Sequence, residues 1–164
     1  MTERGCKNLD EVKDFIQNKI PFFKKVGVLV EMIAPGKIKL GVPYDSNNLN
    51  HFGAFQAGVY LTLAEAAGGA LLATILDLSD VLLLTKECHL KFGEPAKKYL
   101  SYEGLLEVKE SEKIMQELVK KQKIDFPMDI TLLNENGKMA AEARVTYYLR
   151  TGSSSIIKNA QRAM

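Results

Sequence analysis

Residues 54–76 of this chain, AFQAGVYLTLAEAAGGALLATIL, decide its fold. The segment carries one charged side chain, Glu65, and contains no lysine or arginine. A helix that is apolar on every side is either buried on all sides or spans a membrane. Gln56, Glu65 and the pair Gly68-Gly69 disfavour a membrane span, and no aromatic or basic anchors flank the segment. The segment is therefore predicted to be a long helix buried inside a protein, and no membrane partner is expected.

Two β-rich segments precede this helix. Residues 26–33 and 37–42 are predicted to form a hairpin, because Pro35 and Gly36 between them favour a tight turn. The polar, asparagine-rich residues 44–53 that follow are predicted to form a loop, since such side chains can satisfy their own backbone groups.

Four more strands are expected after the helix. In the first, Leu84, Cys88 and Phe92 share the face that packs on the core, whereas His89 points outward. Before the last strand, Asn136-Gly137 favours a type I′ turn and hence a hairpin. The strands are expected at residues 84–92, 99–108, 124–132 and 138–150, with a short charged helix or a loop at residues 111–123.

The two ends of the chain differ from this region. Apolar residues at helical spacing predict a short helix over residues 9–20, which Pro21 is expected to end. The chain is thus divided into an N-terminal helix at residues 1–22 and one domain at residues 23–150. The tail at residues 151–164 contains a glycine and three serines near its start, which predicts mobility.

Charge and cysteine content exclude several classes of function. Lysine and arginine together number 22 against 20 acidic residues, which leaves +2, too little for the basic surface that duplex nucleic acid requires. Cys6 and Cys88 form no disulfide framework, and with two scattered histidines they provide no metal site. No cofactor is expected. The first ten residues lack the apolar stretch of a secretory signal, so a cytoplasmic location is predicted.

The order of elements predicts an α+β fold. Five or six antiparallel strands can curl around one long central helix and cover it, which explains why the helix has no polar face. One sheet does not seal a helix of this length, so its remaining apolar, glycine-lined side is expected to pack against a second subunit. The protein is therefore predicted to be a homodimer or a homotetramer.

Several short motifs now identify a family resemblance. Over residues 26–150 the chain resembles the hotdog superfamily, in particular its phenylacetate-pathway and 4-hydroxybenzoyl-CoA type thioesterases. In those enzymes a His-Gly-Gly turn precedes by nine positions an acidic residue on the central helix, and an asparagine often lies six positions before the turn. Here Gln56-Ala57-Gly58 falls on the turn, Glu65 on the acid and Asn50 on the asparagine, with glutamine replacing histidine and alanine replacing glycine. The other motifs shared with the family are Pro35-Gly36, Leu63-Ala64-Glu65-Ala66-Ala67-Gly68, Lys91-Phe92 and Pro95-Ala96.

The resemblance implies an acyl-CoA thioesterase that hydrolyses an acyl-CoA or acyl-carrier thioester. Glu65 is the expected general base or nucleophile, because its same-face helical neighbours cannot pair with a charge and an unpaired buried carboxylate is costly. The N–H groups of Ala57 and Gly58 at the positive helix end would bind the oxyanion, and the family gives this role to Ala57. Asn50 and Gln56 would orient the carbonyl or the water, although asparagines in such a loop more often form turns.

Other residues are weaker candidates for substrate binding. The pair Gly68-Gly69 is costly in a helix interior, which suggests close approach of an acyl or pantetheine chain, or of the partner's helix. The lysines that could meet the phosphates of coenzyme A are Lys91, Lys97 and Lys98.

Two other functions remain open. Hotdog dehydratases have a catalytic histidine fourteen positions before the helix glutamate, and His51 keeps that spacing to Glu65, although the prolines of the dehydratase loop are absent. A non-catalytic hotdog protein that binds acyl-CoA as a sensor is the third hypothesis.

Overall fold

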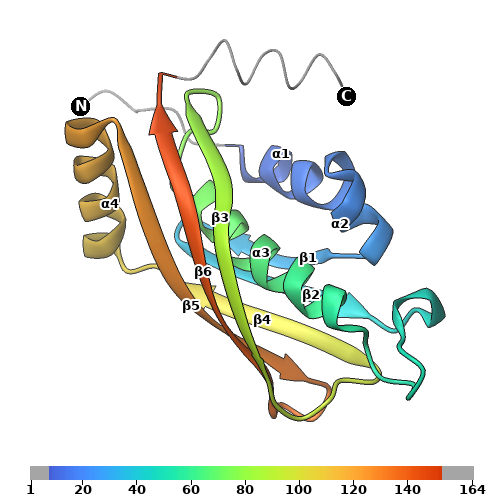
Figure 1. Ribbon diagram of the computed structural model, residues 1–164. Coiled ribbons are helices and arrows are strands. Elements are labelled where there is room, and N and C mark those ends of the chain that lie inside the picture. The colour runs from blue at the N-terminus through green and yellow to red at the C-terminus, as the bar shows by residue number, and fades with distance from the viewer. Residues whose placement is uncertain (1–7, 153–164) are drawn as a thin grey trace.

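A six-stranded antiparallel sheet curves around one long helix in this computed structural model, which describes residues 8–152 (Figure 1). The strands are β1 Leu29–Ala34, β2 Lys37–Pro43, β3 Val81–Phe92, β4 Tyr99–Leu105, β5 Lys123–Asn134 and β6 Met139–Thr151, in the spatial order β1-β2-β4-β5-β6-β3. The helices are α1 Leu9–Asp14, α2 Pro21–Val26, α3 Ala57–Ala73 and α4 Val108–Lys121, with a π-helical turn at Phe15–Lys19 and a 3₁₀ turn at Ser46–Asn48. The predicted α+β fold, with an antiparallel sheet around a central helix, is confirmed.

The central helix α3 is buried along most of its length, as its composition predicts. Leu63, Ala64 and Ala67 have no exposed surface, and α3 packs against β2, β3, β4, β5 and β6. The helix is shorter than the apolar segment, because it begins after the N-cap Gln56 and ends at the C-cap Thr74. No helix within residues 8–152 is long and apolar enough to cross a membrane.

The edge strand β3 differs from its prediction. It begins at Val81, and a β-bulge between Thr85 and Glu87 shifts its pairing with β6. A bulge adds one residue, so the residues before it face the opposite side from the one that strict alternation predicts. Leu84 is therefore 51% exposed, whereas Cys88 and Leu90 pack against the core. The expectation that Leu84 shares the inward face is wrong.

The N-terminal helical segment ends just before Pro21, as predicted, but a second helix that was not predicted follows it. The helical turn before Pro21 ends at Lys19, but Pro21 then begins the new helix α2. Proline is accepted at the first helical position, because the N–H that it lacks would have no partner there. Cys6 lies outside the described residues, and so does the predicted mobile tail at residues 151–164 except for its first two residues, of which Thr151 is the last residue of β6.

The connection between β4 and β5 is helical. Strand β4 ends at Leu105, and the charged segment that was predicted as a helix or a loop is α4, which packs on β5 and β6 through the buried Ile114 and Leu118. Strands β4 and β5 pair only through Leu100↔Asn134 and Ser101↔Leu133. The seam between these two strands is consequently the weakest in the sheet.

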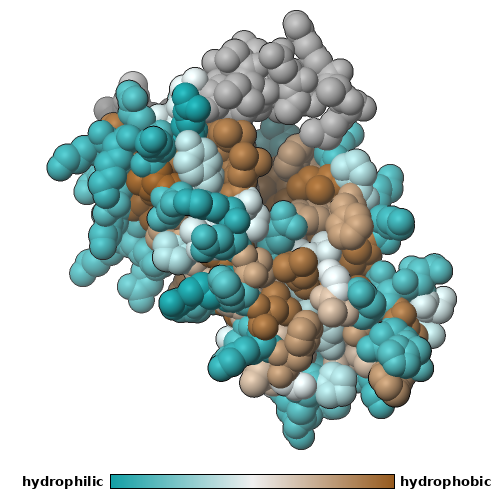
Figure 2. All heavy atoms as spheres, in the orientation of Figure 1, coloured by the Kyte–Doolittle hydropathy of each residue, from teal (hydrophilic) through white to brown (hydrophobic). Residues whose placement is uncertain are grey.

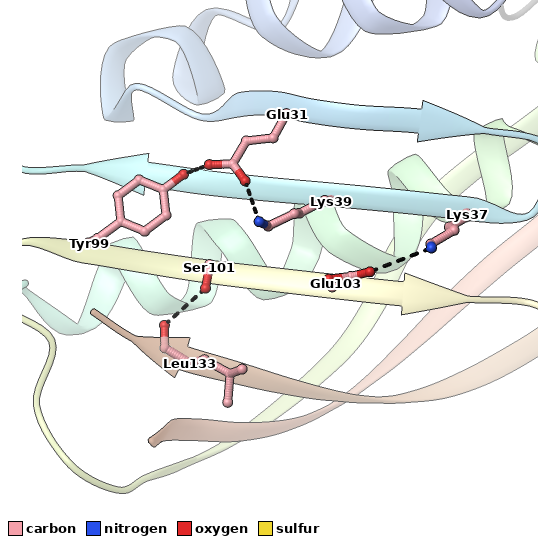
Figure 3. A network of polar contacts seen from close by, with 7 residues as sticks. All are labelled: Glu31, Lys37, Lys39, Tyr99, Ser101, Glu103 and Leu133. Carbon is pink, nitrogen blue, oxygen red and sulfur yellow. Dashed lines mark hydrogen bonds and ion pairs between the residues drawn. The ribbon is translucent and has the colours of Figure 1, made fainter. Parts of the chain in front are cut away.

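Polar contacts hold the first three strands together on their outer face. The Tyr99 hydroxyl of β4 reaches across β2 and donates to the Glu31 carboxylate of β1, which also pairs with Lys39 of β2 at 3.1 Å (Figure 3). Gly41 of β2 makes this possible, because a Cβ at that position would overlap the Tyr99 ring. The three strands are thereby tied through one carboxylate.

Helix α3 approaches β6 closely at Gly68. A Cβ on Gly68 would lie 2.5 Å from the ring and hydroxyl of Tyr147, whereas a Cβ on Gly69 would lie 3.7 Å from its nearest neighbours. The close approach suggested by the glycine pair therefore occurs at Gly68, and the group that approaches is Tyr147 of the same chain.

Gly68→Ala and Gly69→Ala should therefore differ in stability. Tyr147 has no exposed surface and cannot move aside freely, so Gly68→Ala is expected to destabilise the fold by about 1–3 kcal/mol, the usual range for overpacking. Gly69→Ala should be neutral or gain up to about 1 kcal/mol of helix propensity. Thermal melts of both variants check this. Equal midpoints would mean that the Tyr147 ring yields without cost.

Candidate functional site

The N-terminus of α3 presents one free backbone donor. Gln56 caps the helix, and its Oε1 accepts the Gly58 N–H at 2.5 Å. The Gln56 N–H donates to the Asn48 carbonyl at 2.8 Å. Among residues 8–152, nothing accepts the Ala57 N–H. Since the positive end of a helix dipole favours negative charge, the Ala57 N–H is the group here that can bind a developing oxyanion. The Gly58 N–H, the other predicted donor, is occupied by Gln56.

Asn50 forms the turn that leads into α3. Its Oδ1 accepts the N–H groups of Phe52 at 2.9 Å and of Ala54 at 3.2 Å, which is the turn chemistry typical of asparagine. Its Nδ2 donates to no group among the described residues. Asn50 can therefore build the turn through its oxygen and still offer its amide hydrogens to a ligand.

A cleft of about 230 Å³ opens beside these two groups. Both Asn50 and Ala57 line it, and its remaining walls are mostly apolar. These walls are formed by Ala54, Phe55, Tyr60, Phe92, Gly93, Pro95 and Ala140. A concave site with apolar walls and a few convergent polar groups suits a ligand with an apolar part and a polar reacting group.

Two aromatic residues of the cleft were not predicted as site residues. The rings of Tyr60 and Phe92 meet edge to face, with centroids 5.4 Å apart. The Ala96 N–H donates to the Tyr60 hydroxyl at 2.9 Å, and burial raises the pKa of that hydroxyl, so it stays neutral. Tyr60 lies three residues after Ala57 and hence on the same helical face, a relation that the sequence does contain.

Glu65 lies away from this cleft, half-buried on α3. It follows Ala57 by eight positions, which is about 12 Å along a helix axis. Its carboxylate makes no hydrogen bond or ion pair with any of residues 8–152. One chain therefore holds the predicted carboxylate and the predicted oxyanion donor too far apart to act on one carbonyl group.

The negative charge of Glu65 affects two neighbouring groups, the Cys88 thiol and the Tyr147 hydroxyl. Burial first, and the negative charge of Glu65 second, raises the pKa of the Cys88 thiol above its usual value. Burial also raises the pKa of the Tyr147 hydroxyl, and the Glu65 charge adds to that effect. The thiol stays protonated at neutral pH, so Cys88 is not the nucleophile here.

The remaining candidates lie on the exposed surface. His51 is exposed, packs its ring on Phe52 at a centroid distance of 3.9 Å and does not line the cleft. The three lysines proposed to meet coenzyme A phosphates are all exposed, near the end of β3 and in the loop after it. His89 is exposed on β3, as predicted. In residues 8–152 no three histidine, cysteine or acidic side chains gather as metal ligands would.

The family model for a domain of unknown function, DUF4442, matches residues 10–149. The chain belongs to this family. A crystal structure of a Pseudomonas aeruginosa protein of unknown function, PA5026, described as a probable thioesterase, is 31% identical with a TM-score of 0.79, and the match covers 87% of this chain and 95% of that one. No curated protein sequence matches the chain significantly.

Two solved structures of lower sequence identity share the fold. The mutant thioesterase PA1618 of Pseudomonas aeruginosa is 18% identical with a TM-score of 0.66, over 90% of this chain and 97% of that one. The thioesterase HI1161 of Haemophilus influenzae is 14% identical with a TM-score of 0.65, and the match covers 92% of this chain and 96% of that one. The resemblance to hotdog thioesterases is thus confirmed, whereas the phenylacetate or 4-hydroxybenzoyl subtype stays a prediction.

Asn50 allows its two roles to be separated. Asn50→Ala removes both hydrogen bonds of Oδ1 and should lower stability by about 1–2 kcal/mol, or about 3–6 °C in melting temperature. Asn50→Asp keeps the acceptor oxygen and should melt close to the parent. If Asn50→Asp melts as low as Asn50→Ala, the turn depends on more than Oδ1.

Proposed function

We propose that this family member is an acyl-CoA thioesterase whose active site forms between two copies of the chain. The observation that carries the proposal is the Ala57 N–H at the start of α3, which no group within residues 8–152 accepts and whose residue lines an apolar cleft together with Asn50. The carboxylate of Glu65, which has no partner among the same residues, supplies the other group that hydrolysis needs. The relatives described as thioesterases support the same reaction class.

The uncovered side of α3 supports a second copy as the missing wall. Leu61, Glu65 and Gly69 recur every four residues and form a stripe that the sheet leaves open, with Leu61 46% exposed. Figure 2 shows hydrophobic side chains gathered down the middle of the face on which β3 lies in Figure 1. Water-exposed apolar surface of this kind is typical of an interface.

The edge of β3 gives the second copy a place to pair. Within residues 8–152 only β6 pairs with this strand of 12 residues, so one side of its backbone has no partner in that part of the chain. The other edge strand, β1, is packed against α1 and the π-helical turn. A long open edge is a template for another strand, and antiparallel pairing of two β3 edges is two-fold symmetric. That arrangement brings the α3 stripes together.

The chemistry then follows from two facing helices. Glu65 of the partner subunit takes a proton from water, whose oxygen bonds to the thioester carbonyl carbon beside Ala57 of the first. The Ala57 N–H and the helix dipole stabilise the oxyanion, and the Asn50 amide orients the carbonyl. Collapse of the intermediate breaks the C–S bond, and the proton passes to the leaving thiolate. Direct attack by the carboxylate, followed by hydrolysis, uses the same groups.

The alternative functions receive less support. His51 does not line the cleft, so the hydratase or dehydratase alternative lacks its catalytic group at this site. A non-catalytic acyl-CoA sensor would bind without turnover, which the assay below detects. A cytoplasmic location and the phosphate-binding role of Lys91, Lys97 and Lys98 stay predictions.

The test of the function is Glu65→Gln in a thiol-release assay over a panel of acyl-CoAs. Loss of the base or nucleophile should lower hydrolysis by about 10² or more. Stability should hold or rise, because the amide replaces a half-buried carboxylate that has no partner among residues 8–152. Glu112→Gln removes the same charge from the exposed surface of α4, away from the β3 edge, and should hydrolyse at the parent rate. Parent activity in Glu65→Gln, or an inactive parent that binds acyl-CoA, would refute the proposal.

The shared site makes a second prediction. Leu61→Asp places a charge on the open α3 stripe and should convert the dimer to monomer, with hydrolysis falling by about 10² or more because Glu65 and Ala57 separate. Val119→Asp changes an apolar residue of α4 that is 74% exposed and should leave assembly and rate unchanged. Light scattering and the thiol-release assay measure both. A parent protein that is monomeric and active would contradict the shared site.

A further inference from the structure

Tyr147 is the one buried residue on the inward face of β6 that has a polar side-chain group. Its neighbours on that face, Val145 and Leu149, are aliphatic and fully buried, whereas Tyr147 between them has a hydroxyl and no exposed surface. A phenylalanine would fill the same space with less desolvation, since burying a hydroxyl costs free energy unless it is hydrogen-bonded. The hydroxyl must therefore be explained by the groups that it binds.

The Tyr147 hydroxyl binds the backbone of Glu65 itself. It lies 2.8 Å from the Glu65 carbonyl oxygen and 3.2 Å from that of Ala64, so its proton is shared between two consecutive carbonyls of α3. Gly68 permits this contact, because any side chain there would meet the tyrosine ring. The turn of α3 that carries Glu65 is thus fixed to β6 by one side chain.

We propose that Tyr147 is the positioning residue for Glu65, holding the helical turn so that the carboxylate meets the thioester carbonyl. The proposal rests on the proposed function. Tyr147 acts through the backbone and does not touch the substrate. An error of about 1 Å in the placement of a catalytic group can lower turnover about 10²-fold, so loss of this contact should affect the rate more than binding.

The experiment is Tyr147→Phe, which keeps the ring against Gly68 and removes only the hydroxyl. We expect kcat to fall about tenfold or more while KM stays within about twofold, because the cleft at Ala57 is unchanged. Thr74→Val is the matched control. It also removes a buried hydroxyl that binds an α3 carbonyl, that of Leu71 at 2.7 Å, but at the far end of the helix, where the hydroxyl also accepts the Gly36 N–H at 2.9 Å. Its melting temperature should fall, and its kcat should equal the parent value.

Combination with Glu65→Gln shows whether Tyr147 acts through the carboxylate. In the Glu65→Gln background, Tyr147→Phe should cause no further loss of the residual rate, because residues that act as a unit are not additive. Full additivity, parent kcat in Tyr147→Phe, or an equal loss in Thr74→Val would each overturn the proposal. Should Tyr147→Phe not fold, Gly68→Ala displaces the same hydroxyl and must show the same non-additivity. If Glu65→Gln loses hydrolysis but Tyr147→Phe does not, the proposed function stands and the proposed role of Tyr147 is refuted. Parent activity in Glu65→Gln refutes both.

Discussion

The constraint on which the structure depends is that α3 has no side suited to water. Its apolar residues must be covered around almost the whole circumference, and a curved sheet is the arrangement in which one chain covers most of it. The side that remains carries Leu61, Glu65 and Gly69, so the same shortage of cover that implies a second copy also leaves the carboxylate accessible. The proposed second copy and the accessibility of Glu65 thus have the same cause, the side of α3 that the sheet leaves uncovered.

The length of α3 also separates two chemical groups, the Ala57 N–H and the Glu65 carboxylate. Its first turn offers a backbone donor at the positive end of the dipole, where negative charge is stabilised. Glu65 lies two turns later, where apolar packing keeps it without a partner among the described residues. A negative side chain in the first turn would compete with the oxyanion for Ala57, so the spacing keeps the two functions from cancelling each other. In the proposed dimer, two antiparallel copies bring the two groups together.

Much of this could be predicted from the sequence, because composition and period depend on local physics. The buried helix and the approximate positions of the strands follow from patterns within a few residues. Ala57 and Gly58 were both predicted as oxyanion donors, and the choice of Ala57 came from the family resemblance. The bulge in β3 and the role of Tyr147 could not, because each depends on pairing with residues far along the chain. The pair Gly68-Gly69 predicted the close approach of another group but not which group it is, since a glycine shows only that a side chain is missing. Turn formation was one of two predicted roles of Asn50, and the loop geometry shows that its Oδ1 accepts the hydrogen bonds of the turn.

The narrow seam between β4 and β5 affects how the molecule holds together as it unfolds. Strands β1, β2 and β4 form one half of the sheet and β5, β6 and β3 the other, joined edge to edge by two residue pairs. Helix α3 packs on strands of both halves and is the main body of apolar contact between them. Cooperativity across the sheet therefore passes through the helix core rather than through the hydrogen-bond ladder. Amide protons along this seam lie where sub-global opening requires the fewest ladder bonds to break.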